Sequence, residues 1–206
     1  MAHEVTQRVA QGKQVRSGRG PLVSSAVRNF TERGYHGTSM RDIASGAGVT
    51  VASIYHHFAS KQEVLVHIMA GTLTDLLSVT VAADEAADRT ARARLEAVVD
   101  AWVLFHTERQ SEALIGASEI RSLEGPGRDT VVGLRDEQEA LFRSIVTAGV
   151  ESGEFATAYP REAARAILNM GSMVSSWYRP GGELSPEEMS ERYRDFALGT
   201  VRAVGA

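Results

Sequence analysis

The sequence of 206 residues contains no cysteine, so disulfide bonds and metal sites with thiolate ligands are excluded. The first twenty residues carry basic side chains but no apolar core, so they do not form a secretory signal. No run approaches the roughly 18 consecutive apolar residues that a transmembrane helix requires. These absences predict a soluble, cytoplasmic protein that does not have a membrane as partner.

Sequence motifs of common enzymes are also missing. There is no G-x-S-x-G elbow, no P-loop and no G-x-G-x-x-G turn, and each of these would indicate a particular chemistry. Di-iron bundles need Glu-x-x-His pairs, whereas Glu63 and His67 are four residues apart. His56 and His57 point about 100° apart on a helix and lack a third ligand nearby. The sequence therefore predicts no catalytic residue, no cofactor and no metal site, with a helical-bundle enzyme or carrier as the alternative.

Charge is distributed unevenly along the chain. The net charge is −4, but residues 1–70 have a surplus of four positive charges and the remainder a surplus of eight negative ones. A basic head on an acidic body favours local binding of phosphates by the head. The uneven charge is consistent with a nucleic acid as partner.

Apolar residues recur at helical spacing from Pro21 onward, and no segment alternates at period two for long enough to be a strand. The predicted fold is all-α with about nine helices. We expect a flexible basic tail over residues 1–20, a DNA-binding domain over 21–69, and a ligand-binding and dimerisation domain over 70–206. The expected helices of the third part cover residues 89–107, 110–123, 128–153 and 160–178, with a last one that begins after Ser185.

The most informative stretch is residues 38–61, TSMRDIASGAGVTVASIYHHFASK. Two short helices are expected here, over residues 40–47 and 51–58, and Thr38 or Ser39 caps the first. Two such helices joined by a tight glycine-containing turn form a helix-turn-helix. The outward residues of the second helix carry hydroxyl and apolar groups and few acids, which suits entry into the major groove of DNA.

This stretch resembles the DNA-binding signature of the TetR family of bacterial repressors. The match runs through TSMRDIA, GVTVASIYHHF and SKQE, in order and spacing, across roughly residues 22–69. The resemblance implies that residues 51–53 read base edges and that other polar residues hold phosphates. Relatives often have a basic or polar residue in place of Val51, so base readout here is expected to use methyl contacts and Arg41. The predicted DNA-binding residues are Thr38, Ser39, Arg41, Thr50, Val51, Ala52, Ser53, Tyr55, His56, His57 and Lys61.

The last two helices are predicted to form the face of a homodimer. The helix over residues 160–178 is apolar on two sides, so one side can face a twofold-related partner and the other the protomer's interior. The resemblance agrees, because the last two helices of TetR proteins usually form a four-helix bundle across the dimer. An ordinary monomer core is the alternative. The predicted dimer-face residues are Ile167, Gly171, Val174, Tyr178, Met189, Tyr193, Phe196 and Thr200.

A ligand pocket is expected where bulky apolar residues are mixed with a few polar ones, because Met and Trp make adaptable linings and Asn169 or His106 can orient a polar group. Each candidate can also be plain core. The predicted pocket residues are Trp102, Phe105, His106, Ile115, Leu141, Phe142, Ile145, Asn169, Met173 and Trp177.

The segment ILNMGSMVSSWYRPGGELSPEEM resembles a TetR subgroup that controls lipid, steroid or fatty-acid breakdown. This resemblance implies a small-molecule effector such as an acyl-CoA, whose phosphates Arg121 or Arg128 could meet. The expected mechanism is a population shift in which the helix after Ser60 moves the two DNA-reading helices apart. A DNA-binding regulator without a ligand is the alternative.

Several questions stay open from sequence. They are the operator, the effector, the regulated genes and the choice between repression and activation. The tail has two readings, either an arm that places Arg16 and Arg19 in the minor groove or a disordered solubilising segment.

Overall fold

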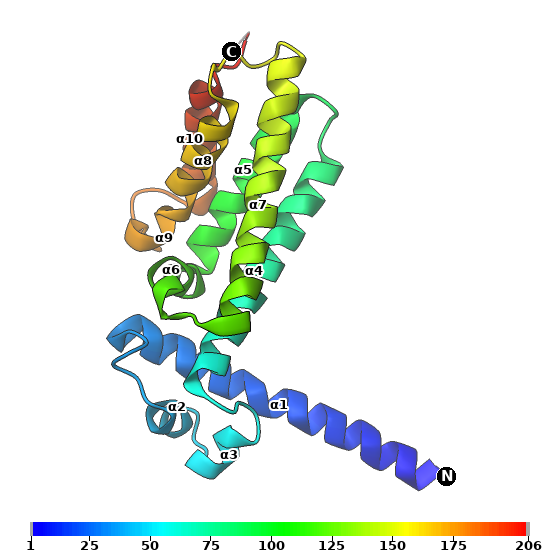
Figure 1. Cartoon of the computed structure of the whole chain (residues 1–206), viewed down its shortest axis with the longest axis vertical. Helices are drawn as coiled ribbons and strands as arrows, with labels where there is room; N and C mark the ends of the chain where they lie inside the picture. The colour runs from blue at the N-terminus through cyan, green and yellow to red at the C-terminus, as the bar shows by residue number, and fades with distance from the viewer. Residues whose placement is uncertain (1, 205–206) are drawn as a thin grey trace.

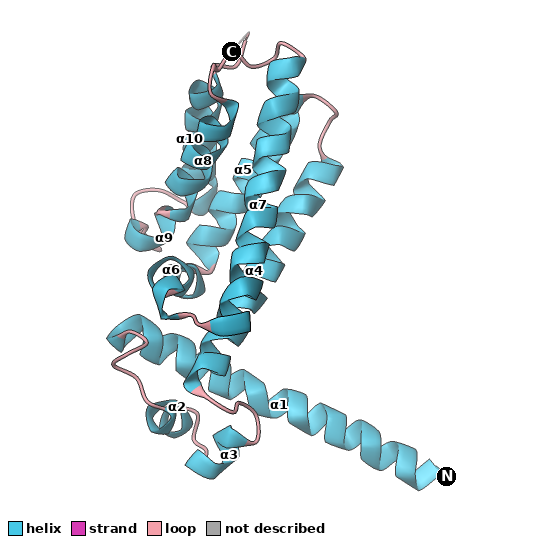
Figure 2. Ribbon diagram, viewed as in Figure 1, coloured by secondary structure: helices cyan, strands magenta, loops and turns pink. Residues whose placement is uncertain are grey.

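The computed structural model describes the main chain of residues 2–204 and the side chains of residues 18–204. Helices dominate this part of the chain, and the one β-bridge found in it joins Phe155 to Ala203. Figure 2 shows helices joined by short loops. The elements are α1 (Ala2–Arg33), α2 (Met40–Gly46), α3 (Val51–Tyr55), α4 (Lys61–Ala86), α5 (Ala91–Glu108), α6 (Gln110–Ser118), the 3₁₀ turn η1 (Ile120–Ser122), α7 (Gly125–Glu151), α8 (Pro160–Ser172), α9 (Val174–Trp177) and α10 (Pro186–Val201).

The molecule has a small head and an elongated body (Figure 1). The head consists of α1–α3 and the first turns of α4, and its core is centred on Phe30, Ile54 and Phe58. The body is a bundle of α4–α10 with a separate core around Trp102 and Phe142. The predicted all-α architecture, with an N-terminal helix-turn-helix and a helical body, is confirmed.

Several helix boundaries in the body differ from the sequence-based expectation. Residues 160–178 form two helices, because the chain turns at Met173 and places α9 after α8. The helix expected from Gln110 ends at Ser118 and is followed by η1. The Gly125-Pro126-Gly127 stretch forms the first turn of α7 instead of a break before it, since proline lacks only an N–H that is unpaired at that position.

The main chain continues α1 back to Ala2, through the stretch for which a tail was expected. Residues with high helix propensity (alanine, glutamine, lysine and arginine) are frequent there, and they allow a helix begun downstream to extend past Pro21. The side chain of Arg16 lies outside the described residues. The domain boundaries remain predictions.

Helix α4 connects the head to the body. By length and composition it could cross a membrane, although its sequence has no apolar run as long as a span was expected to need. One face of it, which includes Val64, Ile68 and Leu76, is, however, buried against other helices, and it packs along α5 and α7. These contacts are those of a core helix, and they place α4 in both halves of the molecule.

The N-terminus of α5 is capped from a distant segment. The carboxylate of Glu154, in the loop after α7, accepts hydrogen bonds from Ala91 N at 3.1 Å and Arg92 N at 3.0 Å. These bonds satisfy two of the four N–H groups that a helix N-terminus leaves unpaired, and they hold the pKa of Glu154 below its ordinary value. The cap therefore ties the top of α5 to the end of α7.

Glu154→Ala is expected to lower the free energy of unfolding by about 1 kcal/mol at neutral pH. Because the carboxyl pKa is lowered in the folded state, this contribution is present above the unfolded pKa of about 4.3 and is lost as the pH falls through the folded value. Urea unfolding of both proteins from pH 7 to pH 3 measures it. Glu151→Ala, at an exposed carboxylate near the end of α7, is the control. A difference between wild type and Glu154→Ala that persisted unchanged at pH 3 would contradict the role of the charge.

Candidate nucleic-acid interface and effector cavity

Both helices of the helix-turn-helix are held by caps at their first turns. Ser39 caps α2, with its Oγ accepting from Asp42 N at 3.2 Å while Asp42 Oδ2 accepts from Ser39 N at 2.8 Å. Thr50 caps α3 by accepting from Ser53 N at 3.2 Å. Gly48, with φ of +69°, makes the left-handed turn between the two helices, a conformation that glycine adopts without strain. The predicted helix-turn-helix is therefore present.

Helix α2 lies close against α1. Ser25 Oγ donates to Ile43 O at 2.9 Å, and Arg28 Nη2 donates to Gly46 O at 3.1 Å. A side chain at Gly46 would overlap Ser25 Oγ and come within 2.9 Å of Arg28 Nη2. The position of α2 thus depends on hydrogen bonds from α1 and on a glycine at the contact.

The outer face of α3 is exposed. Val51 and Tyr55 are among the most exposed large apolar side chains of the described part of the chain. The other predicted residues that reach the surface here are Ser39, Arg41, Thr50, Ala52 and His56, with Ser53 and His57 half-buried. The helix is shorter than expected and ends at Tyr55, so the two histidines lie in the turn after it.

Thr38 does not lie on this face, which corrects the prediction that its side chain holds a phosphate. Its side chain is 2% exposed, and its hydroxyl donates to Gly34 O at 2.9 Å and to Asn29 O at 3.2 Å. Lys61 is also engaged inside the head, because its Nζ donates to Tyr35 O at 2.6 Å and to Thr38 O at 2.7 Å. An ammonium has three N–H donors, so Lys61 has one beyond these two bonds, and its contact with a phosphate stays a prediction.

Arg19 supports the end of the recognition helix, a role that the sequence analysis missed. Its Nη2 donates to His57 O at 3.1 Å, and its guanidinium lies over the ring of Phe58 at 5.2 Å. Gly18 leaves room for the ring of His57, which would lie 2.9 Å from a Cβ at that position. A basic residue near the C-terminus of a helix is favourable for the helix dipole, but the sequence gives no sign that residue 19 reaches residue 57.

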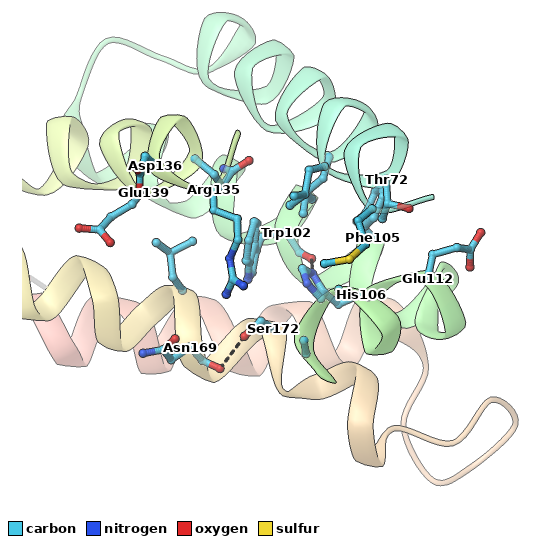
Figure 3. A pocket seen from close by; sticks show the side chains of 18 of the residues that line it. Thr72, Trp102, Phe105, His106, Glu112, Arg135, Asp136, Glu139, Asn169 and Ser172 are labelled. Carbon is cyan, nitrogen blue, oxygen red and sulfur yellow. Dashed lines mark hydrogen bonds between the residues drawn. The ribbon is translucent and has the colours of Figure 1, made fainter. Parts of the chain in front are cut away.

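A cavity of about 430 Å³ lies in the body among α4–α8 (Figure 3). Four of the predicted pocket residues line it, namely Trp102, Phe105, His106 and Asn169. The volume is within the range of small-molecule sites. The apolar part of its lining includes Met69, Leu73 and Leu76 of α4, which the prediction did not include.

Six predicted pocket residues lie elsewhere. Phe142 and Ile145 are fully buried in the body core, Leu141 packs against that core, and Ile115 belongs to the head-side core. Met173 and Trp177 are 52% and 50% exposed on the outside of the body. Apolar composition alone could not distinguish these three environments.

Charged side chains surround the cavity. Arg165 Nε lies 3.0 Å from Glu139 Oε1, and Arg135, Asp136 and Glu112 complete the charged part of the lining. Figure 3 shows Arg135 extending between Trp102 and Asn169. The cations at the cavity are therefore Arg135 and Arg165; Arg121 and Arg128, expected from sequence, are not part of the lining.

The comparisons with known proteins cover both halves of the chain. Residues 22–68 match the family of bacterial regulatory proteins named tetR, and residues 88–201 match the tetracyclin repressor-like C-terminal domain. The HTH-type transcriptional repressor KstR2 of Mycobacterium tuberculosis H37Rv is 31% identical over 196 residues, which are 93% of this chain and 96% of that protein. The chain belongs to the TetR family.

Other TetR relatives show the same extent of similarity. KstR2 of Rhodococcus jostii is 33% identical over 87% of this chain and 89% of its own. The solved ketosteroid transcriptional regulator KstR2 of M. tuberculosis has a TM-score of 0.81 at 28% identity, covering 89% of this chain and 94% of its own. AibR, solved with isovaleryl coenzyme A and operator DNA, shares the fold with a TM-score of 0.77 at 24% identity, covering 87% and 95%.

Five of the eight residues predicted for the dimer face lie inside the protomer, which corrects the prediction for them. Ile167, Gly171, Val174, Tyr178 and Met189 are all buried inside the protomer. Gly171, for instance, contacts the indole of Trp102 so closely that a Cβ there would overlap it.

The exposed apolar groups of α8–α10 lie on other faces of these helices. Met173 and Trp177 lie there, and on α10 Phe196 is 55% exposed and stacks edge-on with the half-buried Tyr193 at 5.6 Å. Thr200 is half-buried, and its hydroxyl donates to Phe196 O at 2.7 Å. When a helix is apolar on all sides, its sequence does not indicate which side faces the interior of the protomer.

Proposed function

We propose that this TetR-family protein is a ligand-responsive repressor that binds operator DNA as a homodimer in the cytoplasm. The observation that carries the proposal is the course of α4. Its first residues contact the head, through Lys61, and its middle residues, Met69 to Leu76, line the cavity. A molecule in the cavity therefore touches the same rigid element that positions the DNA-binding face.

A second connection joins the cavity to the head. Gln62 of α4 donates to Ser122 O at 3.0 Å and accepts from Glu124 N at 2.7 Å, and the hydroxyl of Tyr35 lies 2.9 Å from its amide. Tyr35 N donates to Glu119 Oε1 at 3.3 Å, just after α6. Since α6 also lines the cavity, a ligand that shifts α4 or α6 changes the hydrogen bonds that hold the head.

Two heads are needed for the proposed DNA binding. A twofold dimer that reads two half-sites places its recognition helices 34–36 Å apart. Met173, Trp177 and Phe196 are at least half exposed apolar side chains near the C-terminal end of the chain, and we propose that they meet the partner protomer, since large apolar side chains are common in the buried centre of dimer interfaces. A change in the distance between the two heads would weaken DNA binding. We propose that the effector acts by causing this change.

The effector that we propose is an anionic, largely apolar molecule such as an acyl-CoA. An apolar interior suits an acyl or ring system, and Arg135 at the cavity suits phosphate or carboxylate groups, with Arg165 beside it already paired with Glu139. Two similar proteins support such a ligand. KstR2 is described as a ketosteroid transcriptional regulator, and AibR was solved in complex with isovaleryl coenzyme A. A thermal-shift screen with acyl-CoAs and the free acids tests it. Stabilisation by at least one acyl-CoA is expected, and no stabilisation by any of them would favour a regulator without a ligand.

Selection of duplexes from a random-sequence library by the purified protein tests the DNA-binding part. We expect an enriched palindromic sequence that binds more tightly than random duplex at the same salt concentration. If no sequence were enriched, sequence-specific recognition would be contradicted.

Arg19→Ala is expected to weaken binding to the selected duplex about fivefold, because the end of α3 loses its hydrogen bond and its cation–π contact. The salt dependence of binding should not change if Arg19 acts only through α3. Arg41→Ala, at an exposed residue of α2, should reduce the salt slope by about one ion. Fluorescence anisotropy between 50 and 300 mM KCl measures both, and a reduced slope for Arg19→Ala would show instead that Arg19 contacts a phosphate.

A further inference from the structure

One histidine in the effector cavity has a defined hydrogen-bonding state. His106 is 5% exposed and lines the cavity, and its Nδ1 lies 2.7 Å from the main-chain oxygen of Trp102 (dashed in Figure 3). A carbonyl oxygen can only accept a hydrogen bond. The proton at this contact therefore belongs to Nδ1.

The same ring is neutral at physiological pH. Burial lowers the pKa of His106 to about 4, so only one of its nitrogens carries a proton. That proton is on Nδ1, which leaves Nε2 with a lone pair. Within the described part of the chain, His106 makes no hydrogen bond through Nε2. Nε2 is not among the fully enclosed polar atoms without a partner in the described residues, so it is open to the cavity, where a water molecule or a ligand can donate to it.

The surroundings of the ring are aromatic. The ring of Trp102 lies 4.5 Å from that of His106 and the ring of Phe105 lies 6.1 Å away, centroid to centroid. The indole Nε1 of Trp102 is buried without a hydrogen-bond partner. Because Nε1 is enclosed against Gly171, it is out of reach of a ligand, and this wall of the cavity offers apolar surface and one free acceptor, Nε2 of His106.

From this geometry we infer that the effector carries a hydroxyl group on an apolar skeleton, and that this hydroxyl donates a hydrogen bond to Nε2 of His106. The inference rests on the proposed function, since it describes one end of the molecule that the cavity binds. A ketone, an ether or a carboxylate has no proton to donate and would leave Nε2 unpaired. A hydroxyl is the smallest uncharged group that can donate this bond.

An ammonium group fits this end less well. It would be buried against aromatic rings, and its charge would lose hydration with no carboxylate beside the imidazole to replace it. The acidic residues of the lining are Glu112, Asp136 and Glu139, and none of them hydrogen-bonds to His106. The polar end of the effector at His106 is therefore neutral, and any anionic end belongs near the arginines.

Matched probes test the inference without knowledge of the natural effector. 2-Adamantanol and 2-decalol are compared with the ketone and the methyl ether of the same skeletons, by calorimetry and by the ¹⁵N chemical shift of His106 Nε2 in the full-length protein. We expect the alcohols to bind at least about tenfold more tightly than their analogues and to shift the Nε2 resonance, which a ligand bound elsewhere would not do. Equal affinity of alcohol and ketone, an unmoved Nε2 resonance, or no binding by any alcohol would overturn the inference.

Two variants give the control. His106→Phe keeps an aromatic ring but removes the acceptor, so the preference for alcohols should disappear, whereas His106→Gln retains a carbonyl acceptor and should recover part of it. A preference that survived in His106→Phe would overturn the inference even if that variant were less stable. Release of the selected duplex by an acyl-CoA in His106→Phe would leave the proposed function intact, because it requires only the cavity and α4.

Discussion

Trp177→Glu is expected to convert the protein from a dimer to a monomer and to lower its affinity for the selected duplex about a hundredfold or more. Trp177 is half exposed on α9, beside the equally exposed Met173. A carboxylate there would be buried without a partner in the proposed interface, which is strongly unfavourable. A monomer binds one half-site, and it loses the gain in affinity that two linked sites provide. Sedimentation and fluorescence anisotropy measure the two effects.

The matched control is Tyr159→Glu. Tyr159 is 70% exposed but precedes α8, and it is not part of the proposed interface. The Tyr159→Glu substitution introduces the same charge at another exposed aromatic residue. This variant should remain dimeric with unchanged DNA affinity. A Trp177→Glu protein that stayed dimeric would show that the subunits meet through another surface.

Gly46→Ala is expected to weaken DNA binding at least about tenfold and to destabilise the head by about 1–3 kcal/mol. The added methyl group would overlap Ser25 Oγ, which donates to Ile43 O, and would press on Arg28. To relieve the overlap, α2 must move away from α1 and carry the turn before α3 with it. Anisotropy with the selected duplex and thermal unfolding measure the change.

Gly71→Ala separates this effect from the loss of a glycine as such. No atom lies within 4 Å of a Cβ at Gly71, and the residue is exposed in the middle of α4. Alanine there should stabilise the helix by up to about 1 kcal/mol and leave DNA binding intact. If both glycine variants lost DNA affinity equally, the close contact of α1 and α2 would not be the cause.

The head could be predicted from sequence because its signals are local. Ser39, Thr50 and Ser60 are capping residues that precede short or long helices, and each of them caps the helix that follows in the structure. The signature of residues 38–61 then assigned the domain to a family. Thr38 shows the limit of this approach, because two adjacent hydroxyl residues were both candidates for the cap and only the packing of α1 decides which one is buried.

The body could be predicted only in outline. Residues 160–178 are apolar on two sides, and the choice between the sides depends on which helices pack against them. The structure places Gly171 against Trp102, so the side with Ile167 faces inward and the side with Trp177 faces outward. The same limit applies to the pocket, since Phe142 and Phe105 have similar sequence surroundings but only Phe105 lines the cavity. Long-range contacts such as that of Arg19 with His57 leave no local pattern.

The central claim is that α3 of each protomer enters one half-site of a DNA duplex and that a molecule in the cavity ends this contact. Hydroxyl-radical footprinting of the selected duplex, with and without a stabilising acyl-CoA, tests it most directly. Two equivalent protected segments are expected, one helical turn or a multiple of it between their centres, and both should lose protection together when the ligand is added. A single protected segment, or protection that saturating ligand leaves unchanged, would contradict the account.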